Sequence, residues 1–381
     1  MSAPILPGAT LGVLGGGQLG RMFALAARRL GYRVAVFVPE DDSPAGQVAD
    51  RTLRADYGDL EQVERFAREV DVVTFEFENV PAATAEAAGR HAPVRPAGSV
   101  LHAAQNRARE KRAMADLGLA VAPWAALASA EELRAAGARV GFPAILKSSS
   151  SGYDGKGQVR VERAADLAAA WRSIGEVPAV LEGVVRFEHE LSVVGVRGPD
   201  GAVALYEPTL NEHVDHILDV SLSPAPVPAP VADEARAMAR AVLAGLDVVG
   251  VLCVELFLDA DGTLRVNEIA PRPHNSGHVT LDAHVCCQFE QQVRAVCGLP
   301  LGSTERRVPA AAMVNLLGDL WRDGEPDWAA ALADPDVRLH LYGKTRAARG
   351  RKMGHLNVAD ADVGRARERA LAARERLLRR S

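Results

Sequence analysis

The sequence predicts a protein of mixed α/β and α+β class, in which a doubly wound N-terminal domain precedes a second region of helices and sheet. Two observations predict it. Apolar runs at residues 10–14, 34–38 and 70–77 alternate with helical patterns, as in a parallel sheet covered by helices. Farther along, residues 144–147 form an apolar strand that leads into a polar, glycine-rich loop, and residues 248–269 have the pattern of a β-hairpin.

The N-terminal elements follow one another at short intervals. The first strand precedes a glycine cluster and a helical pattern that runs through Leu30. After the second strand come a turn-rich segment and an amphipathic helix at residues 60–68, which leads to the third strand. A helix at residues 107–117 then begins the second region, so we place the end of the first domain near residue 105.

The middle of the chain contains a proline-rich segment and the hairpin. Prolines alternate along residues 223–230, so we expect an extended connector there, followed by a helix at residues 233–245. The hairpin is expected from strands at residues 248–258 and 264–269.

The chain ends in an arginine-rich helix at residues 365–380. Glu368 and Glu375 interrupt its positive charge, and few bulky apolar residues are available for insertion into a bilayer. We therefore expect a solvated terminal helix rather than a membrane-surface or nucleic-acid element.

Composition excludes several classes of function. The chain has 381 residues, of which 48% are hydrophobic, and its 44 Lys and Arg against 49 Asp and Glu leave a net charge of −5. That balance argues against non-specific binding to nucleic acid or anionic lipid. We expect no signal peptide and no membrane span, since charged residues or proline interrupt every apolar stretch. The four cysteines lack C-x-x-C spacing, which favours reduced, buried thiols and a cytoplasmic enzyme.

The glycine cluster after the first strand is a candidate phosphate site. Gly15, Gly17 and Gly20 satisfy G-x-G-x-x-G between a strand and a helix, where main-chain N–H groups can face an anion. A dinucleotide site would also use an acidic residue about twenty positions on, for which Glu40 or Asp41 qualifies. The alternative is that the glycines only let the helix pack tightly. The rest of the chain offers no hydride-transfer site.

The hairpin is the most informative stretch for chemistry. A two-residue turn at Asp261-Gly262 places Glu255 directly opposite Glu268, and a loop shifted by one residue leaves them diagonal on the same face. Two carboxylates so placed repel unless a cation lies between them, and oxygen ligands favour Mg²⁺. Asn267 can add a neutral oxygen. The alternative, an exposed carboxylate pair, is weakened by the apolar residues around both positions.

Three further segments carry candidate groups. Lys147 precedes a loop of small residues at 148–158 that has no Walker motif but suits a phosphate flap, the alternative being a plain surface loop. Residues 270–278 combine one arginine, two histidines, an amide and a hydroxyl, which suits a small oxyanion better than zinc. Lys344, Arg351 and Lys352 either close on a phosphate ester or form a solvated basic loop. Glu182 and Glu190 are candidate acceptors for a nucleotide's base or ribose.

Together these residues resemble the ATP-grasp superfamily, and more closely its 5-(carboxyamino)imidazole ribonucleotide synthase family of purine biosynthesis. The matching motifs are GGGQLGRM at 15–22, TFEFENVP at 74–81, GYDGKGQ at 152–158, NEIAPRPHNSGH at 267–278 and GRKMGHLN at 350–357. The resemblance covers nearly the whole chain. It implies an ATP-grasp fold with an N-terminal pre-ATP-grasp domain at 1–105, an ATP-grasp domain at 106–300 whose mobile lid spans about 123–197, and a small C-terminal domain at 301–381 that completes the substrate site.

The resemblance also implies a reaction. ATP phosphorylates bicarbonate to carboxyphosphate, and the amine of 5-aminoimidazole ribonucleotide captures the carboxyl group, in de novo purine (IMP) biosynthesis. The implied enzyme is a cytoplasmic ligase that uses ATP and Mg²⁺, with Mn²⁺ as a substitute, acts on small molecules only, and forms a homodimer. The alternative within the superfamily is formate-dependent phosphoribosylglycinamide formyltransferase, and biotin carboxylase shares the bicarbonate step. From other classes, we considered a nucleotide-binding regulatory protein and a nicotinamide dehydrogenase.

The resemblance assigns roles residue by residue. It implies ATP binding by Arg107, Lys147, Gly152, Tyr153, Asp154, Gly155, Lys156, Gly157, Glu182, Val185, Glu190, His213, Asn267 and Glu268. It implies metal binding by Glu255 and Glu268, and catalytic roles for Arg272, His274, Tyr153 and Lys156, with Arg272 and His274 orienting bicarbonate. It implies ribonucleotide binding by Gln18, Leu19, Glu78, Asn275, Ser276, Lys344, Arg351 and Lys352. The serine run at 148–151 and the pair Leu281-Asp282 depart from the family pattern, which affects flap contacts only.

Overall fold

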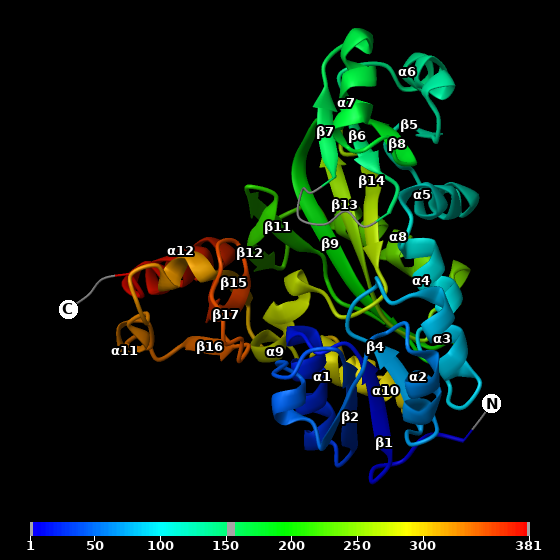
Figure 1. Ribbon diagram of the computed structural model, residues 1–381. Coiled ribbons are helices and arrows are strands. Elements are labelled where there is room, and N and C mark those ends of the chain that lie inside the picture. Colours follow the sequence, from blue (N-terminus) through cyan, green and yellow to red (C-terminus); the bar gives the residue numbers. More distant parts are fainter. Residues whose placement is uncertain (1–2, 151–156, 379–381) are drawn as a thin grey trace.

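Buried side chains on both faces of the N-terminal sheet explain why its strands are nearly continuous apolar runs. The computed structural model describes residues 3–150 and 157–378. The parallel strands lie in the order β3-β2-β1-β4, with bounds β1 (Thr10–Leu14), β2 (Arg33–Val38), β3 (Arg51–Arg54) and β4 (Val72–Phe75). The helices here are α1 (Gln18–Arg29), α2 (Leu60–Ala67), α3 (Ala82–Gly89) and α4 (Gly98–Ala104), and the next helix, α5 (Arg107–Asp116), contacts strands of the other two sheets. α1 packs on one face and α2 with α3 on the other, which confirms the doubly wound domain (Figure 1).

A long, mostly antiparallel sheet forms the centre of the molecule. Its strand order is β14-β13-β9-β11-β12-β15-β17-β16, with β10 paired to β9. The strands are β9 (Phe187–Arg197), β10 (Val203–Leu205), β11 (Thr209–Val214), β12 (Ile217–Ser223), β13 (Gly250–Asp259), β14 (Leu264–Ala270), β15 (Ala310–Leu317), β16 (Val337–Leu341) and β17 (Lys352–Asp360). Its helices are α8 (Ala229–Gly245), α9 (Thr280–Ala283), α10 (Gln288–Cys297), α11 (Trp328–Ala331) and α12 (Val363–Arg376), with a 3₁₀ helix η4 (Asn275–Val279).

The C-terminal strands extend this central sheet. β15 pairs with β12 in antiparallel register, with Val314 opposite Val220, so the sheet continues from the central strands into the C-terminal ones. Figure 1 shows the C-terminal strands beside β12, to the left of the central strands. The domain boundaries near residues 105 and 300 remain predictions.

A smaller sheet stands at the top of the molecule in Figure 1. Its order is β5-β8-β6-β7, with bounds β5 (Trp124–Leu127), β6 (Ala144–Ser148), β7 (Gln158–Val161) and β8 (Ala179–Gly183). The helices α6 (Leu133–Val140) and α7 (Leu167–Ser173) complete this unit. Its own core, which includes Leu146, Trp171 and Leu181, makes it a distinct packing unit.

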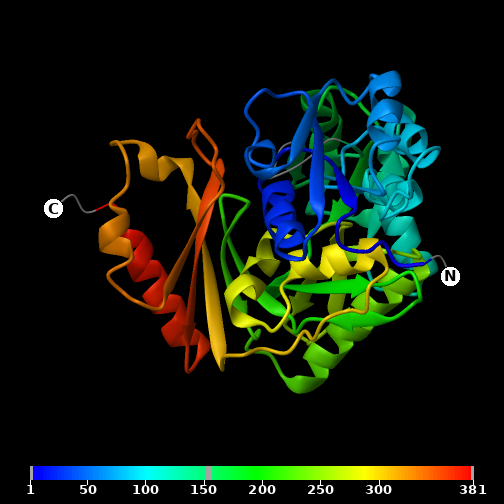
Figure 2. The same ribbon diagram turned by 90° about the horizontal axis from the view of Figure 1, so that it is seen from below.

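One helix joins the N-terminal domain to the central sheet. Phe289, Val293 and Val296 of α10 pack in the same core as α1, and the other side of α10 contacts β9 and β13. In Figure 2 this helix lies between the two sheets. The N-terminal domain is therefore docked through a helix that comes after residues 270–278 and α9 along the chain.

The predicted pairing of the two hairpin glutamates is confirmed, but through a different turn. The loop has three residues, because Asp259 pairs with Thr263 through its N–H at 3.0 Å. That loop alone would shift the register by one residue. A β-bulge at Asn267 restores it, so Glu255 lies opposite Glu268 although Leu256 pairs with Val266.

Several predicted boundaries were wrong. Ser223 belongs to β12 and α8 begins at Ala229, so the extended connector spans only 224–228. A proline at the second helical position, Pro230, is compatible with a helix because the N–H groups there have no intrahelical acceptor. The strand predicted at residues 70–77 is β4, and it is shorter than predicted, at Val72–Phe75.

The terminal helix is not simply solvated, which corrects that prediction. Ala366, Ala370, Ala373 and Leu377 are buried on one face of α12, in the core that the central sheet shares. Arginines on the helix pair with acidic residues of neighbouring elements, as Arg367 does with Glu212 at 2.7 Å. The small alanine side chains let the helix approach the sheet closely.

Two further predictions concern membrane-spanning helices and the state of the cysteines. Among the described residues, no helix combines the length and apolar character needed to cross a bilayer. Cys253, Cys286, Cys287 and Cys297 are free and buried, as predicted.

Candidate active site

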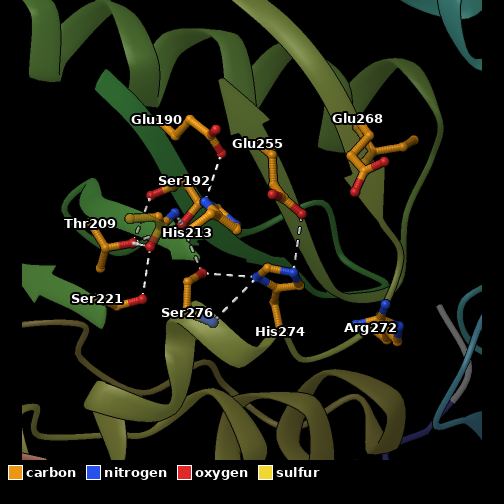
Figure 3. Close-up of polar contacts among 12 residues, drawn as sticks. Glu190, Ser192, Thr209, His213, Ser221, Glu255, Glu268, Arg272, His274 and Ser276 are labelled. Atoms are coloured by element: carbon orange, nitrogen blue, oxygen red, sulfur yellow. Dashed lines mark hydrogen bonds and ion pairs between the residues drawn. The ribbon is translucent and has the colours of Figure 1, made fainter. Parts of the chain in front are cut away.

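Two carboxylates face each other on neighbouring strands at the centre of the site. Glu255 on β13 and Glu268 on β14 are paired in register, and both side chains lie on the face shown in Figure 3. Burial favours the neutral acid, but the charge of His274 outweighs it and lowers the pKa of Glu255 to about 2. Burial and the charge of Glu255 raise the pKa of Glu268. The two carboxylates therefore repel each other, and a cation bound between them would relieve that repulsion.

This donor set fits Mg²⁺ shared with a substrate. Among the described residues, no group of three or more His, Cys, Asp and Glu side chains could hold a metal by itself. Mg²⁺ in phosphoryl-transfer sites is usually held by one or two carboxylates together with phosphate oxygens and water. Glu255 and Glu268 can supply such a pair of carboxylates.

His274, in the segment after β14, makes contacts through both ring nitrogens and through its main-chain N–H and carbonyl groups. Its Nε2 lies 3.1 Å from Glu255 Oε1, and its Nδ1 lies 2.9 Å from Ser276 Oγ. Gln288, which the sequence analysis did not single out, accepts from the His274 N–H at 2.8 Å and donates to its carbonyl at 2.7 Å. Burial alone would lower the pKa of His274, but Cys253 and Glu255 raise it to about 10. The imidazole is therefore charged at neutral pH.

Beneath this segment lies a buried network of hydroxyl and amide groups. Ser276 Oγ accepts from Ser192 Oγ at 2.7 Å, and Ser192 contacts Thr209 at 2.7 Å and Asn211 at 2.9 Å. Ser221 of β12 continues the network to Asn211 of β11, and Ser192 belongs to β9 (Figure 3). The predicted substrate residue Ser276 thus has its hydroxyl engaged within the protein.

Asn275, also predicted to bind substrate, has the opposite environment. Its side chain is buried, and neither its amide nitrogen nor its amide oxygen has a hydrogen-bond partner in the described part of the chain. A buried amide without partners is costly. Asn275 is thus available to a ligand at the active-site segment.

Arg272 and Glu78 form a bidentate ion pair. Arg272 Nη2 donates to Glu78 Oε1 at 3.1 Å, and Arg272 Nε donates to the other oxygen. Burial opposes ionisation, yet the arginine lowers the pKa of Glu78. The structure therefore brings together a residue predicted for bicarbonate and a residue predicted for the ribonucleotide.

The predicted nucleotide residues gather between the small sheet and the central sheet. Lys147 Nζ donates to Glu182 Oε2 at 2.9 Å, and Lys111, which the sequence analysis missed, lies 3.3 Å from the other oxygen. Despite burial, these two lysines lower the pKa of Glu182. Lys111 follows Arg107 by one helical turn on α5, a spacing that marks a shared face. Arg107 Nη1 lies 3.5 Å from Glu268 Oε2.

Three other predicted nucleotide residues lie nearby. Glu190 of β9 pairs with His213 Nδ1 of β11 at 2.9 Å, and this contact raises the pKa of His213 although burial opposes it. Val185 follows β8 and lines a cavity of about 420 Å³ with Pro123 and Arg265.

Of the predicted flap residues 152–157, only Gly157 belongs to the part of the chain that the structure describes. Gly152, Tyr153, Asp154, Gly155 and Lys156 lie outside the described residues. Gly157 is described: its φ is +71°, a value that favours glycine, and its carbonyl accepts from the Ser148 N–H at 2.8 Å.

The N-terminal loop and the C-terminal basic loop come together at one side of the site. The carbonyl of Gly343 accepts from Gln47 Nε2 at 2.8 Å, which fixes the segment before Lys344 against the N-terminal domain. Lys344 Nζ donates to the carbonyl of Lys352 at 2.6 Å, and burial followed by Arg351 lowers the pKa of Lys344 to about 8. Arg351 is exposed and donates to the Arg346 carbonyl at 2.7 Å.

In the N-terminal glycine loop, the side chains and the main-chain N–H groups have different roles. Leu19 has a buried side chain that belongs to the core, so only its main chain can meet a substrate. The N–H groups of Gly17 and Gly20 donate to Glu76 at 2.7 and 3.0 Å. Glu76 was missed by the sequence analysis although it stands two residues before Glu78.

Comparison with known families covers most of the chain. The ATP-grasp domain model matches residues 112–289, and the ribonucleotide synthetase preATP-grasp domain model matches residues 8–105. The phosphoribosylaminoimidazole carboxylase C-terminal domain model matches residues 311–369. The fold class predicted from the sequence is confirmed.

Individual relatives are similar along almost their full length. The N5-carboxyaminoimidazole ribonucleotide synthase of Brucella melitensis is 45% identical over 352 residues, covering 92% of this chain and 96% of the relative. That of Bacillus subtilis is 42% identical, covering 92% of each. A crystal structure of the Aspergillus clavatus synthase in complex with ADP and 5-aminoimidazole ribonucleotide has a TM-score of 0.88 at 32% identity, covering 97% of this chain and 99% of that one.

Proposed function

The chain belongs to the N5-carboxyaminoimidazole ribonucleotide synthase family of ATP-grasp enzymes, and we propose which of its residues bind each substrate in that family's reaction. The protein is an ATP-dependent ligase of purine biosynthesis that carboxylates 5-aminoimidazole ribonucleotide. The observation that supports this assignment best is the opposed pair Glu255 and Glu268, which faces His274 in the next segment of the chain. The formyltransferase and dehydrogenase alternatives are set aside, since the relatives carry the synthase name over the full chain.

The nucleotide lies between the small sheet and the central sheet in this proposal. Lys147 and Arg107 supply positive charge beside Glu268, which partly opposes the rise that burial and Glu255 cause in the pKa of that carboxyl. Glu255 and Glu268 hold Mg²⁺ with the phosphates of ATP. The ion would offset the charge that develops on the transferred phosphoryl group.

Bicarbonate lies at the segment that carries Arg272 and His274. Both side chains are cationic and only 17% and 14% exposed, so they can orient a small oxyanion beside the γ-phosphate. Asn275 can add its unpartnered amide to the same anion or to the ribonucleotide. Because Arg272 pairs with Glu78, the carboxyl donor and the ribonucleotide amine meet at this ion pair.

The ribonucleotide phosphate lies between the N-terminal loop and the C-terminal basic loop. The first-turn N–H groups of Gln18 and Leu19 provide donors at the positive end of α1, and Lys344 provides a cation. Arg351 is the exposed member of the set and Lys352 lies beside Lys344. We also infer a homodimer in the cytoplasm, as expected for the family; size-exclusion chromatography with light scattering tests the dimer.

A coupled assay of ADP release tests the function. With ATP, bicarbonate and 5-aminoimidazole ribonucleotide we expect steady ADP formation, and none above background when the ribonucleotide is omitted. Glycinamide ribonucleotide with formate should not replace it. ADP release with the latter pair alone would reject the proposed function.

A further inference from the structure

A buried carboxylate occupies the inside of the glycine-rich loop. Glu76 follows β4, whose neighbour β1 leads into that loop, so the carboxyl ends of two parallel strands place the glutamate there. Its Oε1 accepts the N–H of Gly17 at 2.7 Å and its Oε2 accepts the N–H of Gly20 at 3.0 Å. Both oxygens are therefore used to fix the loop.

The loop is shaped around this side chain. A Cβ atom at Gly15 would lie 2.2 Å from Glu76 Cγ, and one at Gly17 would lie 2.3 Å from Glu76 Oε1. Neither distance is compatible with van der Waals contact, so the glycines leave space for the glutamate itself. The adjoining cavity measures only about 10 Å³, on the order of one water molecule.

Two cations from other parts of the chain affect the same carboxylate electrostatically. Burial raises the pKa of Glu76, and the N–H groups of Gly20 and Gly17 together with the charges of Arg272 and Lys344 partly oppose that rise. Glu76 therefore joins the end of β4 to the glycine loop through two hydrogen bonds. Its location corresponds to neither of the predicted acidic residues Glu40 and Asp41.

Glu76 does not accept from the other N–H groups of the first helical turn, those of Gln18 and Leu19. The first helical hydrogen bond of α1 runs from Arg21 N to Gly17 O at 3.0 Å, so the N–H groups of Gln18 and Leu19 precede the intrahelical ladder. In the described part of the chain they have no acceptor. We call the N–H groups of Gln18 and Leu19 the outer donors, because the inner ones, those of Gly17 and Gly20, are already bonded to Glu76.

We propose that Glu76 is a positioning residue for the phosphate of the ribonucleotide: it anchors the glycine loop from inside, so that the loop accepts one phosphate monoester on its outer N–H groups, next to Lys344. The same side chain excludes the second phosphate of a dinucleotide from the inner donors, because it occupies both of them. This inference rests on the proposed function.

The test compares Glu76→Gln with the wild type on two substrates: 5-aminoimidazole ribonucleotide and the corresponding riboside, which lacks the phosphate. An amide keeps one acceptor and turns an N–H₂ group toward a loop N–H, so the loop loses its anchor. We expect KM for the ribonucleotide to rise about tenfold, with kcat and the KM for ATP within about twofold. The kcat/KM for the riboside should not change, because it has no phosphate to position. Glu86→Gln, an exposed glutamate on α3, is the matched control.

The results distinguish failure of the positioning role of Glu76 from failure of the proposed function. An unchanged KM for the ribonucleotide, or equal losses on both substrates, would overturn the positioning role. If Glu76→Gln does not fold by circular dichroism, Glu76→Asp carries the test, since it keeps the charge but shortens the reach. A selective rise in KM for the ribonucleotide is again expected. A wild-type enzyme without ribonucleotide-dependent ADP release would instead reject the proposed function itself.

Discussion

Glu255 and Glu268 are the same residue type on paired positions, yet their neighbours give them different charge properties. Glu255 has His274 at 3.1 Å, which lowers its pKa, whereas Glu268 has Arg107 only at 3.5 Å and faces the charge of Glu255. Glu255 is thus held as an anion, and Glu268 is the residue that its negative charge destabilises in the ionised form. A bound divalent cation would relieve that repulsion.

Glu268→Gln should therefore separate activity from stability. The amide is nearly isosteric and removes the repulsion, so we expect an unchanged or higher apparent Tm with a loss of ribonucleotide-dependent ADP formation of about a hundredfold or more. Differential scanning fluorimetry and the coupled assay measure the two effects. Glu188→Gln, an exposed glutamate on β9, is the control and should alter neither. Full activity in Glu268→Gln would remove Glu268 from the metal site.

Lys344 predicts a pH dependence of ribonucleotide binding. Burial and Arg351 lower its pKa to about 8, so the side chain is charged below that pH and neutral above it. We expect kcat/KM for the ribonucleotide to fall as the pH rises through about 8, and kcat/KM for ATP to remain level. Lys344→Arg should remove the fall, because arginine stays charged over the accessible range. A fall that persists in this variant would assign the titration to another group.

The glycine loop shows at the scale of an element how two segments constrain each other. Gly15 has φ +118°, a region that L side chains rarely adopt, and Gly17 has an ordinary φ of −80° but no space for a side chain. The first glycine is required by the backbone and the second by the carboxylate of Glu76. Sequence pattern alone cannot distinguish these two requirements.

Gly17→Ala tests the second requirement. The added Cβ would lie 2.3 Å from Glu76 Oε1, so the carboxylate must leave its position and release the loop. We expect a rise of about tenfold in KM for the ribonucleotide, with KM for ATP unchanged. Gly89→Ala is the control, because its Cβ would lie 3.8 Å from Val94 Cγ2, an ordinary contact. If both variants have wild-type kinetics, the fit between Gly17 and Glu76 does not matter for binding.

At the scale of the molecule, buried neutral histidines join the C-terminal strands to the catalytic segment. The ring of His355 stacks between those of His278 and His340, with centroid distances of 4.8 and 4.5 Å. His340 Nε2 also lies 2.8 Å from Asp282 Oδ2. Burial lowers the pKa values of His278 and His355 well below the usual value, and burial with Arg306 lowers that of His284 to about 4.

These histidines predict destabilisation by mild acid. An unfolded histidine has a pKa of about 6.5, so the unfolded chain binds more protons than the folded one once the pH falls below that value. Stability is present above about pH 6.5 and should decrease from there to pH 5, by up to about 1.4 kcal/mol per histidine for each pH unit. Thermal unfolding at pH 7, 6 and 5 measures it.

His284→Phe is the matched variant for this prediction. His284 packs edge-on against Tyr206 at 5.2 Å, and neither of its ring nitrogens has a partner in the described part of the chain, so phenylalanine preserves the aromatic contact without a titrating group. The loss of Tm on acidification should become smaller than in the wild type. A Tm that does not change between pH 7 and 5 in the wild type would contradict the prediction.

The sequence by itself determined the class of chemistry. Motifs keep their functional groups within a few residues, so NEIAPRPHNSGH and the glycine loop identify the reaction wherever they lie in space. The strand periodicity also put Glu255 and Glu268 on one face, although the actual turn has three residues and a bulge at Asn267 compensates.

Tertiary structure decided which distant groups became partners. The pairing of Glu78 with Arg272, the approach of Lys111 to Glu182, the anchoring of the glycine loop by Glu76 and the continuation of the central sheet into the C-terminal strands all join segments far apart in sequence. A local pattern records the preferences of neighbouring residues, whereas these contacts depend on how whole elements pack against one another. The burial and charge that tune each side chain arise only from that packing.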